Sequence, residues 1–270
     1  MSTATTTTHT TQTAHGTLRL RGEDDATPEY LQELYTKGYV VVPDVIPHEQ
    51  AAQYVADANE WLKGFGKGFD INDKSTWWIQ NAGAPWPHVD QSPLKRDMEC
   101  IQGIANLAPN GEDDGGLMIL DGSFPLYNEF FDAHANDQPE GGWPKIDSYH
   151  HTPKQLQWFY DRGCQWKKVN APAGSLILWE SRTIHYGAAP KEGANPRYAT
   201  YVCYKPAAHC PPTHLEVRKE AIKEFRNMSH NPCDARKVPK FFVDVRTEPS
   251  KPFDFESSER AKKLAGLESY

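Results

Sequence analysis

The sequence predicts a mainly β fold with flanking helices, in which two sheets pack together as a jelly roll. Short apolar runs bounded by glycine and proline recur through the middle of the chain, and a pair of segments with helical spacing precedes them. Many short strands that follow a pair of helices are typical of a double-sheet barrel with helices on one side. A chain of 270 residues can form such a barrel as one domain.

The individual elements follow from the spacing of apolar residues. Residues 28–37 and 48–63 have helical periodicity, and the β-branched run 39–42 between Gly38 and Pro43 predicts a buried strand. Residues 64–87 have little periodicity and indicate loop with short strands. Further strands are expected at 100–107, 117–120, 166–170, 174–181 and 197–205, and shorter helices at 153–162 and 214–228.

We expect a polar, disordered tail over residues 1–16 and a single domain over 17–270. Within that domain, residues 121–152 are rich in proline and glycine and show no strand or helix pattern. Long excursions of this kind in a compact fold are usually lids or mobile inserts, so we expect a lid or insert at 121–165.

Composition narrows the classes of function. The net charge of −7 and the absence of a basic arm argue against nucleic-acid binding. The five cysteines are scattered and odd in number, which favours free thiols in a reducing compartment. No apolar run is long enough to span a membrane, and the first residues lack the basic and apolar regions of a secretory signal. The expected location is cytoplasmic, and the oligomeric state is left open.

A short motif, His88-Val89-Asp90, carries the chemistry. In a strand, residues i and i+2 point to the same side, so His88 and Asp90 can face one metal ion, and His185, 95 residues beyond Asp90, can join them from another strand. Two imidazoles and one carboxylate form the facial triad that holds Fe(II) and leaves positions open. We therefore predict that His88, Asp90 and His185 bind a metal.

Arg197 lies 12 residues after His185. The residues between them, 187–196, are rich in glycine, proline and small side chains, which indicates a hairpin loop. Arg197 would then lie on the returning strand, beside the strand that ends at His185. A guanidinium suits a carboxylate held by two bonds, so the pattern predicts a metal with an anchor for a dicarboxylate.

Taken in order, these landmarks resemble the phytanoyl-CoA dioxygenase family of Fe(II)- and 2-oxoglutarate-dependent oxygenases. The resemblance runs from about residue 30 to about residue 206. Its landmarks are residues 30–46 with the strand Gly38-Tyr39-Val40-Val41-Val42-Pro43, then His88-x-Asp90, residues 115–123, residues 172–179, His185 and Arg197. Two positions depart from the family pattern: Phe124 replaces the usual histidine, and Ser175 replaces the usual acidic residue.

The resemblance implies a double-stranded β-helix, the cupin-like jelly roll, and an enzyme that uses Fe(II), 2-oxoglutarate and O2. It implies iron bound by His88, Asp90 and His185, and the distal carboxylate of 2-oxoglutarate bound by Arg197. The implied reaction hydroxylates, or otherwise oxidises, a C–H bond of a small to medium organic metabolite, with release of succinate and CO2. An acyl-CoA substrate is not indicated, because no basic cluster is available for its phosphates.

Further site residues are expected around the triad. Gln102 and Thr200 are candidates for 2-oxoglutarate binding, although Thr200 is odd-spaced from Arg197 and Gln102 can equally be a hydrogen-bonded core amide. Four tryptophans in loop-like segments can line an apolar substrate pocket or serve as core: Trp77, Trp78, Trp86 and Trp143.

Two alternative functions remain open at this point. The first is a jelly-roll binding or sensor protein that holds a metal without turnover; a dicarboxylate anchor argues against it. The second is a desaturase or epoxidase with the same triad, which only product analysis distinguishes from a hydroxylase.

Overall fold

The computed structural model describes residues 11–13, 16–18, 28–64, 66, 68–76, 84–205, 207–224, 226, 228–234 and 258–268. The chain divides into two compact units. Unit 1 comprises Met1–Pro47 and Ala82–Val202, and unit 2 comprises His48–Asn81 and Cys203–Tyr270. The predicted metal ligands all lie in unit 1.

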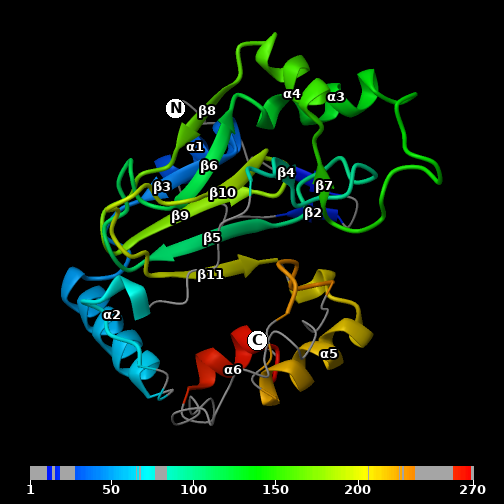
Figure 1. Cartoon of the computed structure of the whole chain (residues 1–270). Coiled ribbons are helices and arrows are strands. Elements are labelled where there is room, and N and C mark those ends of the chain that lie inside the picture. Colours follow the sequence, from blue (N-terminus) through cyan, green and yellow to red (C-terminus); the bar gives the residue numbers. More distant parts are fainter. Residues whose placement is uncertain are drawn as a thin grey trace, which may run out of the picture. The chain divides into compact units, whose positions relative to one another are not determined.

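Unit 1 is built on two sheets that lie face to face (Figure 1). The five-stranded sheet has the order β7 (Tyr149–His150), β4 (His88–Val89), β10 (His185–Ala188), β6 (Gly116–Asp121) and β8 (Gln165–Lys168). The four-stranded sheet has the order β11 (Ala199–Tyr204), β5 (Ile101–Asn106), β9 (Ser175–Glu180) and β3 (Tyr39–Val42). Successive strands alternate between the sheets from β8 to β11, as a jelly roll requires.

Alternation along β9 divides the core of unit 1 in two. Ile177 and Trp179 pack between the sheets, in a cluster with Ile104 of β5 and Ile119 of β6. Leu178, one residue out of phase, faces the other side of the four-stranded sheet and packs against helix α1 (Glu29–Lys37). Ile177 and Trp179 therefore point toward the five-stranded sheet, and we call this side of the four-stranded sheet its inner face.

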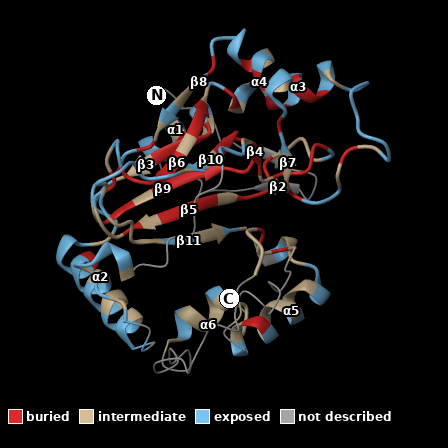
Figure 2. Cartoon of the chain, viewed as in Figure 1, coloured by how far each residue is buried: buried red, intermediate tan, exposed pale blue. Residues whose placement is uncertain are grey.

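Helix α1 ends at Gly38, which has the left-handed conformation (φ 82°) that favours glycine. A Cβ atom at this position would lie 2.5 Å from both the Phe124 side chain and the Thr183 hydroxyl. Figure 2 shows buried residues concentrated in the strands that follow this junction. Gly38 therefore allows the chain to turn directly into β3 at a point of close packing.

The excursion between β6 and β8 is a packed layer. It contains the 3₁₀ helix η2 (Phe124–Leu126), helix α3 (Tyr127–Ala133), strand β7 and helix α4 (Pro153–Tyr160). Phe130, Phe131 and Phe159 are fully buried there, with Leu120 of β6 in the same cluster. Helix α4 begins with a capping box between Thr152 and Gln155, which satisfies its first backbone donors.

Unit 2 consists of helices: α2 (His48–Lys63), η1 (Lys74–Thr76), η3 (Ala207–His209), α5 (Pro212–Lys223) and α6 (Glu259–Ala265). Helices α5 and α6 are in contact, and Arg218 donates a hydrogen bond of 2.8 Å to the carbonyl of Leu264. Over the described part of the chain, no helix has the length and apolar character that crossing a membrane demands.

The structure confirms the predicted jelly roll, with differences in its connections. The loop 187–196 is not a hairpin loop: β10 begins at His185 and belongs to the five-stranded sheet, whereas β11 belongs to the four-stranded sheet. Helix α3 lies in a segment where we expected no regular structure. Residues 1–10, 14 and 15 of the expected tail lie outside the described residues, and β1 (Thr11–Thr13) pairs with β2 (Gly16–Leu18).

Candidate metal centre

His88, Asp90 and His185 come together between the sheets, and their ligand atoms all lie within 4.8 Å of one another. His88 and His185 are direct partners in the pairing of β4 with β10. Nε2 of His88 lies 3.5 Å from Oδ1 of Asp90, and Nε2 of His185 lies 3.3 Å from Oδ2. Among the described residues, this is the one group of three such side chains close enough to share a metal ion.

Both imidazoles are held through their other nitrogen. Nδ1 of His88 lies 3.0 Å from the carbonyl oxygen of Trp86, and Nδ1 of His185 lies 2.9 Å from that of Thr183. A carbonyl oxygen only accepts, so Nδ1 carries the proton and Nε2 keeps its lone pair toward Asp90. Burial, and to a smaller extent the neighbouring His185, lower the pKa of His88 to about 4, so His88 is neutral near pH 7.

The carboxylate of Asp90 is held from the four-stranded sheet. Gln102 of β5 donates a hydrogen bond of 2.9 Å from its amide to Oδ2, and the backbone N–H of Asp90 donates to the carbonyl of Ser181 at 3.0 Å. Gln102 is 3% exposed. It therefore faces the interior as predicted, and its observed partner is the carboxylate of Asp90.

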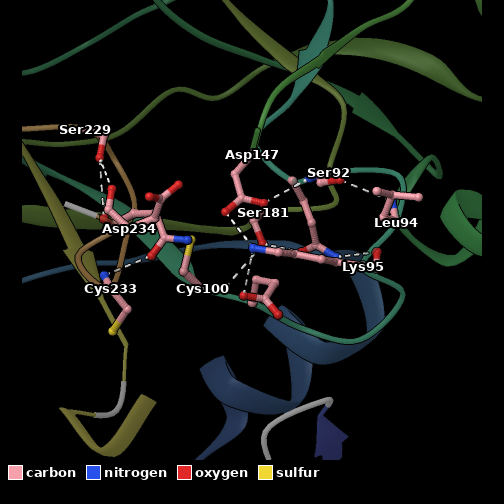
Figure 3. A network of polar contacts seen from close by, with 12 residues as sticks. Ser92, Leu94, Lys95, Cys100, Asp147, Ser181, Ser229, Cys233 and Asp234 are labelled. Carbon is pink, nitrogen blue, oxygen red and sulfur yellow. Dashed lines mark hydrogen bonds and ion pairs between the residues drawn. The ribbon is translucent and has the colours of Figure 1, made fainter. Parts of the chain in front are cut away.

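A polar network surrounds the loop that follows Asp90 (Figure 3). Asp147, from the excursion, accepts hydrogen bonds from the Ser92 backbone at 3.1 Å and from Lys95 Nζ at 2.8 Å. Ser181 donates to the fully buried Gln91 at 2.7 Å. The network ties the excursion to the metal-ligand loop, and no signal in the sequence connects residues so far apart.

Arg197 precedes β11 and shares the inner face with Ala199, which packs against the cluster between the sheets. Its Nε is buried and has no hydrogen-bond partner among the described residues. Its guanidinium lies over the ring of Tyr201 at 5.9 Å, and a terminal nitrogen makes a long contact of 3.5 Å with the Tyr201 hydroxyl. Arg197 is therefore a cation with unused donors on the inner face.

The other predicted residues occupy different environments. Thr200 is exposed and alternates to the face opposite Arg197, so it is not placed to share a ligand with that residue. Trp143 is 6% exposed within the aromatic core of the excursion, so its role is packing. Trp77 and Trp78 lie outside the described residues.

Trp86 lies at the metal centre. Its ring stacks on the imidazole of His88 with centroids 3.8 Å apart, and the residue is 48% exposed. One face of the indole thus fixes the ring plane of His88, while the side chain remains accessible from solvent. His150 is exposed and is the register partner of His88 in β7.

The donor set fits a divalent iron ion. Two neutral imidazole nitrogens and one carboxylate converge from a buried strand pair, with the second nitrogen of each imidazole held by a backbone carbonyl. The unpartnered Nε of Arg197 fits an anion on the same side of the four-stranded sheet.

Comparison with known proteins gives relatives but no matching family model. The "Ava biosynthesis cluster protein O" of Aspergillus versicolor is 28% identical over 293 aligned positions, which cover 83% of this chain and 95% of that protein. The "Putative phytanoyl-CoA dioxygenase" of Dictyostelium discoideum is 26% identical over 136 residues, covering 50% of this chain and 36% of that protein.

Solved structures also align with the chain. HygX from Streptomyces hygroscopicus, crystallised with nickel and 2-oxoglutarate, is 14% identical with a TM-score of 0.44 and covers 68% of this chain and 88% of HygX. The Dictyostelium relative bears the name of the family that the sequence landmarks indicated. The chain resembles the phytanoyl-CoA dioxygenase family of Fe(II)- and 2-oxoglutarate-dependent oxygenases.

Proposed function

We propose that this protein is an Fe(II)- and 2-oxoglutarate-dependent dioxygenase that oxidises a C–H bond of a small to medium organic molecule. The observation that carries the proposal is the convergence of His88, Asp90 and His185 within 4.8 Å, with both Nδ1 atoms held by backbone carbonyls. A chance meeting of polar residues does not account for two imidazoles oriented in the same way toward one carboxylate.

His88, Asp90 and His185 would hold the iron. When bound, the iron with 2-oxoglutarate and O2 supplies the oxidising power for C–H oxidation, with release of succinate and CO2. Gln102 holds one oxygen of Asp90, and the loop network holds the backbone that follows it. His88 and His185 are 4% and 5% exposed, so the protein also limits access of water to the metal.

Arg197 would bind the distal carboxylate of 2-oxoglutarate. A charge-assisted pair of bonds to a carboxylate would use the Nε that lacks a partner among the described residues. A protein that only binds metal has no use for an arginine whose Nε is buried without a partner among the described residues. Arg197 therefore favours the oxygenase over the metal-binding sensor.

The organic substrate would reach the metal beside Trp86, the half-exposed indole stacked on His88. The Aspergillus relative is named for a biosynthesis cluster, which favours a biosynthetic intermediate as the substrate class. Whether the product is hydroxylated, desaturated or epoxidised depends on the substrate's geometry at the metal, so product analysis decides that point.

A succinate-release assay tests the proposal. Purified protein with Fe(II), ascorbate and O2 is expected to convert 2-oxoglutarate to succinate, slowly without substrate and faster with it. The Asp90→Ala variant is the matched negative control because it keeps both imidazoles. The absence of 2-oxoglutarate binding and of succinate formation in the iron-loaded wild type would overturn the assignment.

A further inference from the structure

A buried donor without a partner lies next to the candidate metal centre. Trp179 of β9 is 2% exposed, and its indole Nε1 has no hydrogen-bond partner among the described residues. By contrast, Nε1 of the partly buried Trp166 in β8 donates to the hydroxyl of Tyr160 at 2.9 Å. Buried polar groups in native proteins nearly always have a partner, so the exception at Trp179 calls for one.

The position of Trp179 restricts what that partner can be. In the β5–β9 pairing, Trp179 lies directly opposite Gln102, the residue that donates to the carboxylate of Asp90. The ring centroid of Trp179 lies 5.4 Å from that of His185. The indole is therefore level with the metal centre along the sheet.

Trp179 also shares its face with Arg197. Trp179 and Ile177 belong to the cluster between the sheets, and Ala199, in phase with Arg197 on β11, packs against the same cluster. Two donors on this face, the indole N–H of Trp179 and Nε of Arg197, lack partners among the described residues. Oδ1 of Asn106 and Oγ of Ser175, which are opposite each other at the other end of β5 and β9, lack them too. Next to the metal centre, the donor of this face that lacks a partner among the described residues is the indole N–H of Trp179. A molecule that carries acceptors and reaches the metal can provide that partner.

We propose that Trp179 is a binding residue for 2-oxoglutarate and donates its indole N–H to a carboxylate oxygen of the bound acid. This inference rests on the proposed function, because it takes 2-oxoglutarate as the ligand. The acid carries two carboxylates and a keto oxygen and has no donor of its own, so it can supply the acceptor that the indole N–H of Trp179 lacks.

The test uses the Trp179→Phe variant of the full chain, which keeps an aromatic ring and removes the N–H. Both proteins are loaded with redox-inactive Zn(II), and 2-oxoglutarate is titrated by calorimetry. Loss of a hydrogen bond to a charged acceptor is expected to weaken binding about ten- to a hundredfold. The affinity for Zn(II) itself is expected to stay unchanged, because Trp179 offers no metal ligand. Trp166→Phe is the matched control and should keep wild-type affinity for 2-oxoglutarate, since its N–H is already bonded to Tyr160.

Equal affinity of Trp179→Phe and wild type for 2-oxoglutarate would overturn this inference and leave the proposed function intact. A Zn(II)-loaded wild type that does not bind 2-oxoglutarate would overturn both. If the variant does not fold, the wild type still decides: one of the eight indole N–H signals in its ¹⁵N spectrum should move downfield when 2-oxoglutarate saturates the Zn(II)-loaded protein. No such movement would refute the hydrogen bond.

Discussion

His151 contributes to the acid sensitivity of the protein's stability, and replacing it with phenylalanine should remove that contribution. His151 is 6% exposed and lies among aromatic rings, with centroids 5.1 Å from Tyr149, 5.3 Å from Phe130 and 5.7 Å from Phe159. Its Nδ1 has no hydrogen-bond partner among the described residues. Burial, and to a smaller extent the nearby His88, lower the pKa of His151 from 6.5 to about 3.

The size of the effect follows from proton binding. Above pH 6.5, His151 is neutral in both the folded and the unfolded chain. As the pH falls below 6.5, the unfolded chain takes up a proton while the folded chain does not until about pH 3. Each pH unit below 6.5 lowers the free energy of unfolding by about 1.4 kcal/mol through this residue. At pH 5 the contribution of His151 should therefore have lowered it by about 2 kcal/mol.

Urea denaturation of the metal-free protein at pH 7 and pH 5 measures the difference. Between pH 7 and pH 5, the free energy of unfolding should fall by about 2 kcal/mol more in the wild type than in His151→Phe. The other acid-sensitive groups are the same in both proteins and contribute equally. Phe159→Leu serves as the control: it weakens the same cluster at both pH values and should keep the wild-type difference. A His151→Phe variant that loses as much stability as the wild type would refute the burial of a neutral imidazole.

Three further predictions concern the metal centre. His88→Ala and His185→Ala should each lose most bound Fe(II) while the circular dichroism spectrum is retained; near-normal iron content in either would remove that residue from the ligand set. Arg197→Ala should raise the 2-oxoglutarate requirement for succinate release by about tenfold or more with iron binding unchanged, and Arg197→Lys should recover part of it. If succinate release by Arg197→Ala depends on 2-oxoglutarate concentration as in the wild type, Arg197 has a structural role only. Gln102→Leu should weaken Fe(II) binding by about tenfold, measured by equilibrium dialysis, because Asp90 loses the donor that orients it.

Local patterns were sufficient for the elements that build the barrel. The strand at Tyr39–Val42 and the helix at His48–Lys63 have the expected bounds, because each is a continuous pattern with glycine or proline nearby. The i, i+2 spacing of His88 and Asp90 also brought them to one site, although β4 itself ends at Val89. Backbone periodicity is a local property, and these features depend on little else.

Features that depend on partners distant in the sequence were not predictable in the same way. The glycine- and proline-rich loop 187–196 indicated a chain reversal, but no local signal says that β10 and β11 belong to different sheets. Helix α3 has only seven residues and is held by Phe130 and Phe131 against the excursion's core. Tertiary packing stabilises this helix, and the helix propensity of its sequence alone does not predict it.

The two sheets of unit 1 divide the chemistry between them. The five-stranded sheet supplies the imidazoles, through the direct pairing of His88 with His185. The four-stranded sheet supplies donors: Gln102 to the carboxylate of Asp90, and Trp179 and Arg197 with N–H groups that lack partners among the described residues. Asp90 joins the two layers, since it follows β4 in the chain and accepts from β5. The metal would thus be held mainly from one side, and an acidic co-substrate would be held from the other. This arrangement separates metal affinity from co-substrate affinity, so substitutions at Trp179 and Arg197 should change only the second.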